Sequence, residues 1–394
     1  MESIKNKVAI VGVGYTPQNR EPGRSAMSYH TEAAKNAIED AGLRIEDVDG
    51  MLTQPLPQDD PAGELPYGVM PWTIAQRLGM RLRFCSGQQA MGATAGCIVF
   101  HAACALIYGL ANYVVCTYGE STVVGAGAGR YGGEGRRGDQ AAFGIFGATG
   151  GYAMAARRGM HQFKTGPETW SNIAVAQRQW ANLNPRAIMH DKQMSYDDYF
   201  NSRYVVEPFR LFDICQVSNS GRAFVMTTAE RARDCKHRPV YVLGVGQDHP
   251  VTSIAQSNFM AGPTGAKESG KEAFRMADIT IKDIDACQIY DCYTYTLELE
   301  MMDYGFYGPG EGKDFFANGR TAPGGELPVN TSGGLLSEAY QMSFTHVTEA
   351  VVQLQGRAGE RQLGPATRTR EPEIILVSGN GGTLQTHSTV ILGR

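Results

Sequence analysis

Cys85 is the residue of this chain whose sequence position best suits a nucleophile. It ends a short predicted strand, 82–85, and comes directly before Ser86 and Gly87, where a long apolar helix is predicted to begin. The free N–H groups and the dipole at a helix N-terminus lower the pKa of a nearby thiol and favour the thiolate. Backbone N–H groups at the Ser86-Gly87 turn would also face an oxyanion formed there. Because most free cysteines are small buried hydrophobes, the position alone leaves both interpretations open.

A second set of reactive side chains follows a strand predicted later in the chain. Tyr290, Asp291 and Cys292 stand at the exit of that strand, where the sites of α/β folds are commonly found. Tyr340 follows in the segment 329–341, one to two turns into a predicted helix. Hydroxyl, carboxyl and thiol groups can all give or take protons. Packing of the tyrosine rings accounts for the same pattern, so both an acid/base site and a structural role remain open.

A glycine-rich turn near the end of the sequence precedes a histidine. Gly381 and Gly382 allow a tight turn between two predicted strands, and His387 follows in the second of them. An imidazole there could transfer protons, although a histidine between strands is more often a satisfied core or surface side chain. The sequence has no Ser-His-Asp pattern, P-loop or dinucleotide-binding glycine motif, and it therefore does not indicate a nucleotide fold.

The elements that carry these residues form an internal repeat. Three pairs of segments recur in the same order: 41–50 with 277–286, 83–89 with 329–335, and 113–121 with 373–382. In both halves a strand turns at Ser-Gly into a helix, predicted over 87–109 and 333–356. Since strands alternate with helices in each half, the sequence predicts two similar α/β units.

An insertion separates the two repeated units. Residues 122–151 contain 11 of the 48 glycines, together with Arg130, Arg136 and Arg137. Long loops in compact domains are usually functional or mobile, and arginine binds phosphate well. We interpret this segment as a lid whose arginines contact the phosphates of a ligand; the alternative is a solvated flexible loop.

Composition excludes several classes of protein. The chain has 394 residues with 36 basic and 40 acidic side chains, a net charge of −4, and no basic runs, so we expect neither nucleic acid nor an anionic membrane as a partner. The apolar segment 92–116 is predicted to be a buried helix, a turn and a buried strand, and not a membrane span. The first residues lack the apolar core of a secretory signal. The eight cysteines form no CxxC pairs, and we expect a cytoplasmic protein with reduced thiols and no metal.

Taken together, these motifs resemble the thiolase superfamily over essentially the whole chain. They are the duplicated halves, the Cys85-Ser86-Gly87 turn, the Tyr290-Asp291-Cys292-Tyr293 run, and the glycine-rich segments 330–334 and 378–382. The resemblance is greatest to the sterol-carrier-protein-type branch, including subunits that work with a small zinc-ribbon/OB-fold partner. It implies an α/β fold of duplicated thiolase-like halves in a five-layered αβαβα sandwich, an inserted loop domain over coenzyme A, and a homodimer. We assign 1–121 with 222–258 to the first half, 122–221 to the insertion, and 259–394 to the second half.

The sequence also departs from the family pattern at the catalytic positions. The nucleophilic cysteine of a thiolase falls on Phe84, one residue before Cys85. The family's acid/base and oxyanion positions fall on Tyr290, Tyr340 and Ser378. Such departures leave more than one reaction open.

Three functions are compatible with this pattern. The first is CoA-dependent thiolysis of a bulky, benzoylsuccinyl-type β-ketoacyl-CoA, with Cys85 as nucleophile, Tyr290 or Tyr340 at the enolate, and Cys292 as base for the CoA thiol. The second is retro-aldol cleavage of a β-hydroxyacyl-CoA by tyrosine acid/base chemistry, as in steroid side-chain aldolases, with Cys85 only packing. The third is a non-catalytic acyl-CoA-binding scaffold. We expect the first, an acyltransferase with coenzyme A as substrate or product.

Overall fold

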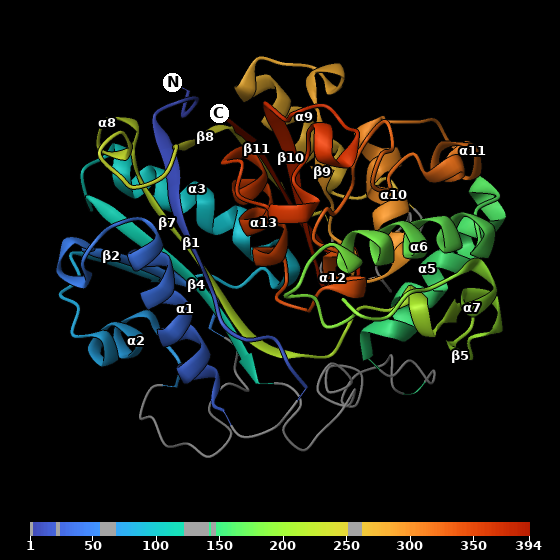
Figure 1. Ribbon diagram of the computed structural model, residues 1–394, viewed down its shortest axis with the longest axis horizontal. Coiled ribbons are helices and arrows are strands. Elements are labelled where there is room, and N and C mark those ends of the chain that lie inside the picture. The colour runs from blue at the N-terminus through green and yellow to red at the C-terminus, as the bar shows by residue number, and fades with distance from the viewer. Residues whose placement is uncertain (1–2, 21–23, 56–67, 122–141, 143–146, 251–261) are drawn as a thin grey trace.

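A mixed sheet of nine strands forms the centre of the protein (Figure 1). The structure is a computed structural model that describes residues 3–20, 24–55, 68–121, 142, 147–250 and 262–394. The strands are β1 (Val8–Tyr15), β2 (Gly50–Thr53), β3 (Phe84–Gly87), β4 (Tyr113–Ser121), β7 (Asn219–Thr228), β8 (Val240–Asp248), β9 (Ala286–Gln288), β10 (Ile374–Gly381) and β11 (Thr386–Gly393). Their order across the sheet is β3-β2-β4-β7-β1-β8-β11-β10-β9.

The internal repeat is visible in the strand pairing. In the first half, helix α1 (Ala26–Asp40) leads through a 3₁₀ turn, Ile45–Asp47, into β2, which is parallel to both β3 and β4. In the second half, α9 (Ala266–Ala277) leads through the 3₁₀ turn Ile281–Asp283 into β9, which is parallel to β10 and to a bridge at Val329. The prediction of two similar α/β halves is therefore confirmed.

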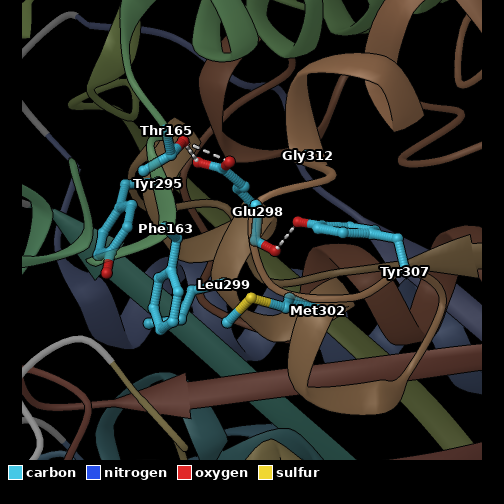
Figure 2. A pocket seen from close by; sticks show the side chains of 9 residues that line it. Phe163, Thr165, Tyr295, Glu298, Leu299, Met302, Tyr307 and Gly312 are labelled. Atoms are coloured by element: carbon cyan, nitrogen blue, oxygen red, sulfur yellow. Dashed lines mark hydrogen bonds between the residues drawn. The ribbon is translucent and has the colours of Figure 1, made fainter. Parts of the chain in front are cut away.

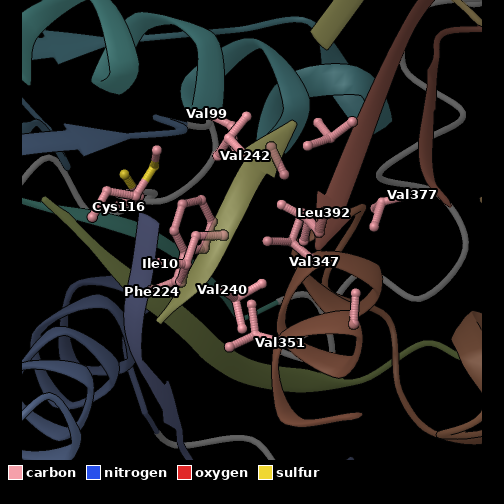
Figure 3. Close-up of a cluster of buried hydrophobic side chains, with 14 of the residues drawn as sticks. Ile10, Val99, Cys116, Phe224, Val240, Val242, Val347, Val351, Val377 and Leu392 are labelled. Atoms are coloured by element: carbon pink, nitrogen blue, oxygen red, sulfur yellow. The ribbon is translucent and has the colours of Figure 1, made fainter. Parts of the chain in front are cut away.

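Helices divide the two halves into layers. Helices α3 (Thr94–Ile107) and α13 (Phe344–Leu354) lie between the halves, α1 and α2 (Pro71–Leu78) cover the outer face of the first half, and α9 and α10 (Thr294–Tyr304) cover that of the second. The two parts of the sheet join where β1 pairs with β8. This is the five-layered α/β arrangement expected from the sequence, and Figure 3 shows the central core, in which Val99 of α3 and Val347 of α13 lie among strand residues such as Leu392.

The apolar segment 92–116 folds as predicted. It forms α3, whose residues are buried on most sides, then a turn and the strand β4. An all-round apolar helix is what a central layer requires, because α3 contacts strands of both halves. Within the described part of the chain, no helix is long and apolar enough to span a membrane.

Helices and a small hairpin lie within 122–221, the segment predicted to be the insertion. They are α5 (Gly147–Phe163), α6 (Pro167–Asn182), α7 (Tyr196–Asn201), β5 (Tyr204–Val206) and β6 (Phe209–Arg210). Helix α6 packs against α10 and against α12 (Gly334–Ser337), which connects this region to the second half. Two short helices, α8 (Ala229–Ala232) and α11 (Gly312–Phe316), complete the fold.

The two long repeated helices differ from their predicted extents, with consequences for the candidate residues. Strand β3 continues through Gly87, because Gly87 pairs with Thr53 of β2, and α3 begins only at Thr94 after a 3₁₀ turn, Met91–Ala93. In the second half the helix is interrupted: α12 ends at Ser337 and α13 begins at Phe344. Cys85 therefore does not precede a helix N-terminus, and Tyr340 lies in a connection between helices.

Candidate active site

The hydroxyl groups of two tyrosines, Tyr290 and Tyr340, lie next to each other. Tyr290 lies two residues after the end of β9, and its hydroxyl oxygen is 3.1 Å from that of Tyr340, within hydrogen-bonding distance. The amide N–H of Tyr290 donates to Ser378 Oγ at 2.8 Å, and that of Tyr340 donates to Ser218 Oγ at 2.9 Å. Both backbones are thus held by buried hydroxyl groups.

Burial determines the protonation state of this tyrosine pair. Loss of water around the hydroxyl groups raises the pKa of Tyr290 and of Tyr340 well above 10. Both residues are therefore neutral phenols at physiological pH. Neutral phenols donate and accept hydrogen bonds and can pass protons without carrying a lasting charge.

Gly92 allows the tyrosine pair to lie close to the start of the central helix α3. A Cβ atom on Gly92, in the 3₁₀ turn before α3, would lie 2.1 Å from the Asn380 carbonyl oxygen and 2.4 Å from the Tyr290 hydroxyl oxygen. Only the absence of a side chain lets the turn approach β10 and Tyr290 so closely. Gly381 plays a similar part, because a Cβ there would lie 2.0 Å from the carbonyl oxygen of Ala90. Gly382 follows with a positive φ of 61°.

A buried carboxylate and imidazole connect the segments that carry the two tyrosines. His346 Nε2 lies 3.0 Å from Asp291 Oδ1, and both side chains are fully buried. The Asp291 carboxylate also accepts the amide N–H groups of Leu335 (3.0 Å) and Leu336 (3.2 Å) in α12. Sequence reasoning did not select His346, which gave no distinct signal because α13 also contains threonine, glutamate and glutamine.

Cys292 lies beside the tyrosine pair as a thiol. Burial raises the pKa of Cys292 to about 12, and its Sγ is 3.6 Å from Thr296 Oγ1. The hydroxyl of Tyr152, whose own pKa burial raises well above 10, donates to the Gly382 carbonyl at 2.5 Å. A thiol with this pKa is a poor general base at neutral pH, which weakens the predicted role of Cys292 toward the CoA thiol.

His387 is connected to the tyrosine pair through other buried side chains. Its Nδ1 is 2.8 Å from Ser269 Oγ, and its Nε2 is 3.2 Å from Glu300 Oε2 without the alignment of a hydrogen bond. Glu300 in turn accepts from Ser378 Oγ, the group that receives the Tyr290 amide. His387 therefore reaches Tyr290 only through Glu300 and Ser378.

Cys85 is placed differently from the sequence prediction. It is exposed and belongs to β3, the outermost strand of the sheet. Ser86 and Gly87 continue the same strand, so their N–H groups do not form the expected turn beside a helix N-terminus. The helix N-terminus and the turn that the sequence predicted directly after Cys85 are therefore not formed at Ser86 and Gly87.

Two predictions about cofactors concern contacts to CoA phosphates and the presence of metal ligands. Arg130, Arg136 and Arg137, predicted to contact CoA phosphates, lie outside the described residues, and their role stays a prediction. Within the described ranges, no three His, Cys, Asp or Glu side chains are grouped as metal ligands would be.

A separate pocket surrounds the buried carboxyl group of Glu298 in α10 (Figure 2). The pocket has a volume of about 240 Å³, part of it open to solvent, and Phe163, Leu299 and Met302 form apolar walls. Glu298 accepts hydrogen bonds from Trp170 Nε1 at 2.7 Å and from the Thr165 hydroxyl. Burial nevertheless raises its pKa from 4.5 to about 7.

We expect this carboxyl group to make stability depend on pH. Between pH 4.5 and about 7 the unfolded chain loses the Glu298 proton while the folded protein keeps it. The free energy of unfolding therefore falls as pH rises through this window, by on the order of 3 kcal/mol from this group. Urea unfolding at pH 5.0 and 7.5 should show a smaller decrease in Glu298→Gln than in the wild type. The exposed Glu326→Gln serves as the control, and an unchanged pH dependence in Glu298→Gln would contradict the assignment.

Comparison with known proteins agrees with this fold. The family model described as "Thiolase C-terminal domain-like" matches residues 246–394. The steroid side-chain-cleaving aldolase of Thermomonospora curvata is 34% identical over 402 residues, covering 97% of each chain. The 17-hydroxy-3-oxo-4-pregnene-20-carboxyl-CoA lyase of Mycobacterium tuberculosis is 33% identical, covering 90% of this chain and 92% of its own. A solved structure described as an "Ltp2-ChsH2(DUF35) aldolase" superimposes with a TM-score of 0.87 at 30% identity, covering 99% of this chain and 98% of its own.

The chain therefore belongs to the thiolase superfamily. Its similarity to the Thermomonospora curvata aldolase and the Mycobacterium tuberculosis lyase extends over nearly the full length, whereas the benzoylsuccinyl-CoA thiolase subunit BbsB of Thauera aromatica is 24% identical over 61% of this chain. The prediction of the superfamily is confirmed. The expected benzoylsuccinyl-type thiolase is less well supported than the alternative, an aldolase.

Proposed function

We propose that this protein cleaves a bulky β-hydroxyacyl-CoA by a retro-aldol reaction, and that the Tyr290–Tyr340 pair moves the proton. The observation that carries the proposal is the pair of neutral hydroxyl groups 3.1 Å apart, one on the buried Tyr290 and the other on the half-buried Tyr340. The thiolytic alternative depends on Cys85, which lies exposed on the outermost strand.

The hydroxyl pair suits a proton relay. One tyrosine takes the proton of the substrate's β-hydroxyl while passing its own proton to the other, which protonates the departing acyl-CoA enolate. The Cα–Cβ bond breaks, the hydroxyl-bearing carbon becomes a carbonyl, and the hydrogen is transferred to the acyl-CoA fragment. No tyrosinate has to accumulate, which is consistent with pKa values raised well above 10 by burial.

The relatives support the substrate class and a partner. Their names describe a CoA-linked lyase and side-chain-cleaving aldolases, and the solved structure with a TM-score of 0.87 is named with a DUF35 component. We therefore assign coenzyme A to this protein as part of the substrate and product, and a small DUF35-type subunit as its partner. The arginines of the 122–151 segment are the proposed contacts for the CoA phosphates.

A reaction without free CoA separates the two chemistries. Retro-aldol cleavage of 17-hydroxy-3-oxo-4-pregnene-20-carboxyl-CoA needs no added CoA, whereas thiolysis consumes one CoA for every bond broken. We expect the protein, together with its DUF35-type partner, to release a ketone and a shorter acyl-CoA from this substrate in the absence of CoA. Liquid chromatography with mass detection identifies both products.

We also expect Cys85→Ser to retain activity within about twofold, because surface substitutions away from a site change little. The expected rate is measured by acyl-CoA release, with the wild type and partner at equal concentrations. Strict dependence on added CoA, together with an acyl adduct on the Cys85 peptide, would overturn the aldolase proposal in favour of a thiolase.

A further inference from the structure

We infer that His346 is a positioning residue for the tyrosine pair and acts through its hydrogen bond with Asp291. This inference rests on the proposed function, since it concerns the same two tyrosines. The two tyrosines are 50 positions apart in the sequence, and a hydrogen bond joins their hydroxyl groups. A proton relay fails when its two oxygen atoms move apart, so the structure must hold these segments together.

Asp291 connects the two segments from the Tyr290 side. It is the residue after Tyr290, so its carboxylate is covalently next to one member of the pair. Its two oxygen atoms accept the amide N–H groups of Leu335 and Leu336 in α12, the helix that leads to Tyr340. The carboxylate therefore fixes the start of the Tyr340 segment relative to Tyr290.

His346 connects the same segments from the Tyr340 side. It lies near the start of α13, directly after the connection that contains Tyr340, and its Nε2 is 3.0 Å from Asp291 Oδ1. Its ring also packs against the Tyr290 ring, with centroids 5.8 Å apart and planes tilted by 43°. One imidazole thus contacts the carboxylate through a hydrogen bond and the phenol through its face.

The chemistry of the pair requires an imidazole in one tautomer. Both Asp291 oxygen atoms already accept backbone N–H groups, so the Nε2–H of His346 is the donor in the hydrogen bond between the two side chains. Nδ1 has no hydrogen-bond partner among the described residues, so His346 is held through Nε2. A residue that merely filled this volume would leave Asp291 Oδ1 without its side-chain donor and would remove the side-chain link between α13 and Asp291.

Two substitutions of His346 distinguish the effect of its hydrogen bond from the effect of its volume. His346→Leu removes the donor, whereas His346→Gln keeps an N–H donor at about the reach of Nε2. We expect His346→Leu to lower kcat at least about tenfold with KM nearly unchanged, because small displacements of reacting groups cost up to ~10²-fold. His346→Gln should recover kcat to within about threefold of the wild type, by the same reasoning.

The control is a packing change in the same helix. Val351→Ala makes a cavity in the central core of α13 and should lower Tm without lowering kcat, measured below the transition. Crystal structures of the two His346 variants should show the Tyr290–Tyr340 hydroxyl distance lengthened beyond 3.5 Å in the leucine variant and kept near the wild-type value in the glutamine variant. If the leucine variant does not fold, His346→Phe removes the same donor while it keeps an aromatic ring beside Tyr290.

The outcomes distinguish this inference from the proposed function. Wild-type kcat in folded His346→Leu, or equal losses in the leucine and glutamine variants, would overturn the positioning role. Full cleavage by Tyr340→Phe would overturn the proposed function itself. Loss of cleavage in Tyr340→Phe with wild-type kcat in His346→Leu would leave the aldolase in place and remove only His346 from it.

Discussion

Replacing Tyr340 with phenylalanine is expected to lower kcat for β-hydroxyacyl-CoA cleavage by about 10²- to 10⁴-fold, the usual contribution of a general acid or base. The substitution removes one oxygen atom and leaves the ring, so packing changes little. Tyr290→Phe should cause a loss of similar size, because its hydroxyl is the other half of the 3.1 Å hydrogen bond. Initial rates of acyl-CoA release, with the partner subunit present, measure the effect.

The effects of the two substitutions on kcat should not be additive. If the hydroxyl groups form one relay, removal of either stops it, and Tyr290→Phe/Tyr340→Phe should be about as slow as each single variant. Tyr307→Phe is the matched control, because it also loses a buried phenol hydrogen bond, the one at 2.5 Å to the Glu298 carbonyl, away from this site. Independent, multiplying losses would mean that the tyrosines act in separate steps.

The pH dependence provides a second check on the relay. Since burial raises both pKa values well above 10, ionisation of these phenols should not produce a rise in kcat between pH 6 and 9. A rise in kcat that follows a single deprotonation near pH 7, and that disappears in Tyr340→Phe, would show that a tyrosinate is the base and would contradict the relay.

Much of the fold could be predicted because its main signal is repeated. The pattern of helix, 3₁₀ turn and strand occurs at 41–50 and again at 277–286, and local residue preferences specify it each time. The apolar helix α3 was likewise predictable, since a helix without a polar face has to lie in a central layer.

The failure at Cys85 has a nonlocal cause. Whether the chain turns at Ser86-Gly87 depends on pairing with β2, where Gly87 lies opposite Thr53, and no local preference reveals that register. The break between α12 and α13 has a similar origin, because Met342 takes a positive φ of 50° there. Sequence spacing therefore identified Tyr340 as a candidate but could not place it in a connection facing Tyr290.

His346 was missed for a related reason. Its partner Asp291 is 55 positions away, and only the folded chain brings the carboxylate and the imidazole together. Tyr290, by contrast, was found because it stands at a strand exit, and both tyrosines fall on family positions. Side chains that contact the reacting groups are thus easier to predict than those that orient them.

Replacing Gly92 with alanine is expected to be the most damaging single-atom addition near the site. The new Cβ would lie 2.1 Å from the Asn380 carbonyl oxygen and 2.3 Å from Cζ of Tyr290. Such overpacking typically costs about 1–3 kcal/mol of stability. We expect a lower Tm and a decrease in kcat of about 10²-fold or more, because reacting groups displaced by 1 Å lose roughly that much.

We expect a catalytic loss because the new Cβ atom would displace the Tyr290 ring more than the Asn380 backbone. Asn380 belongs to β10 and pairs with His387 of β11, which restricts the movement of its backbone. The Tyr290 ring is the less constrained neighbour, and its displacement would separate it from Tyr340. Gly308→Ala is the control, since its Cβ would meet only the flexible Glu311 side chain, at 3.1 Å. Wild-type kcat in a folded Gly92→Ala variant would mean that the Tyr290 hydroxyl can be displaced without loss, and it could not then be the group that transfers the proton.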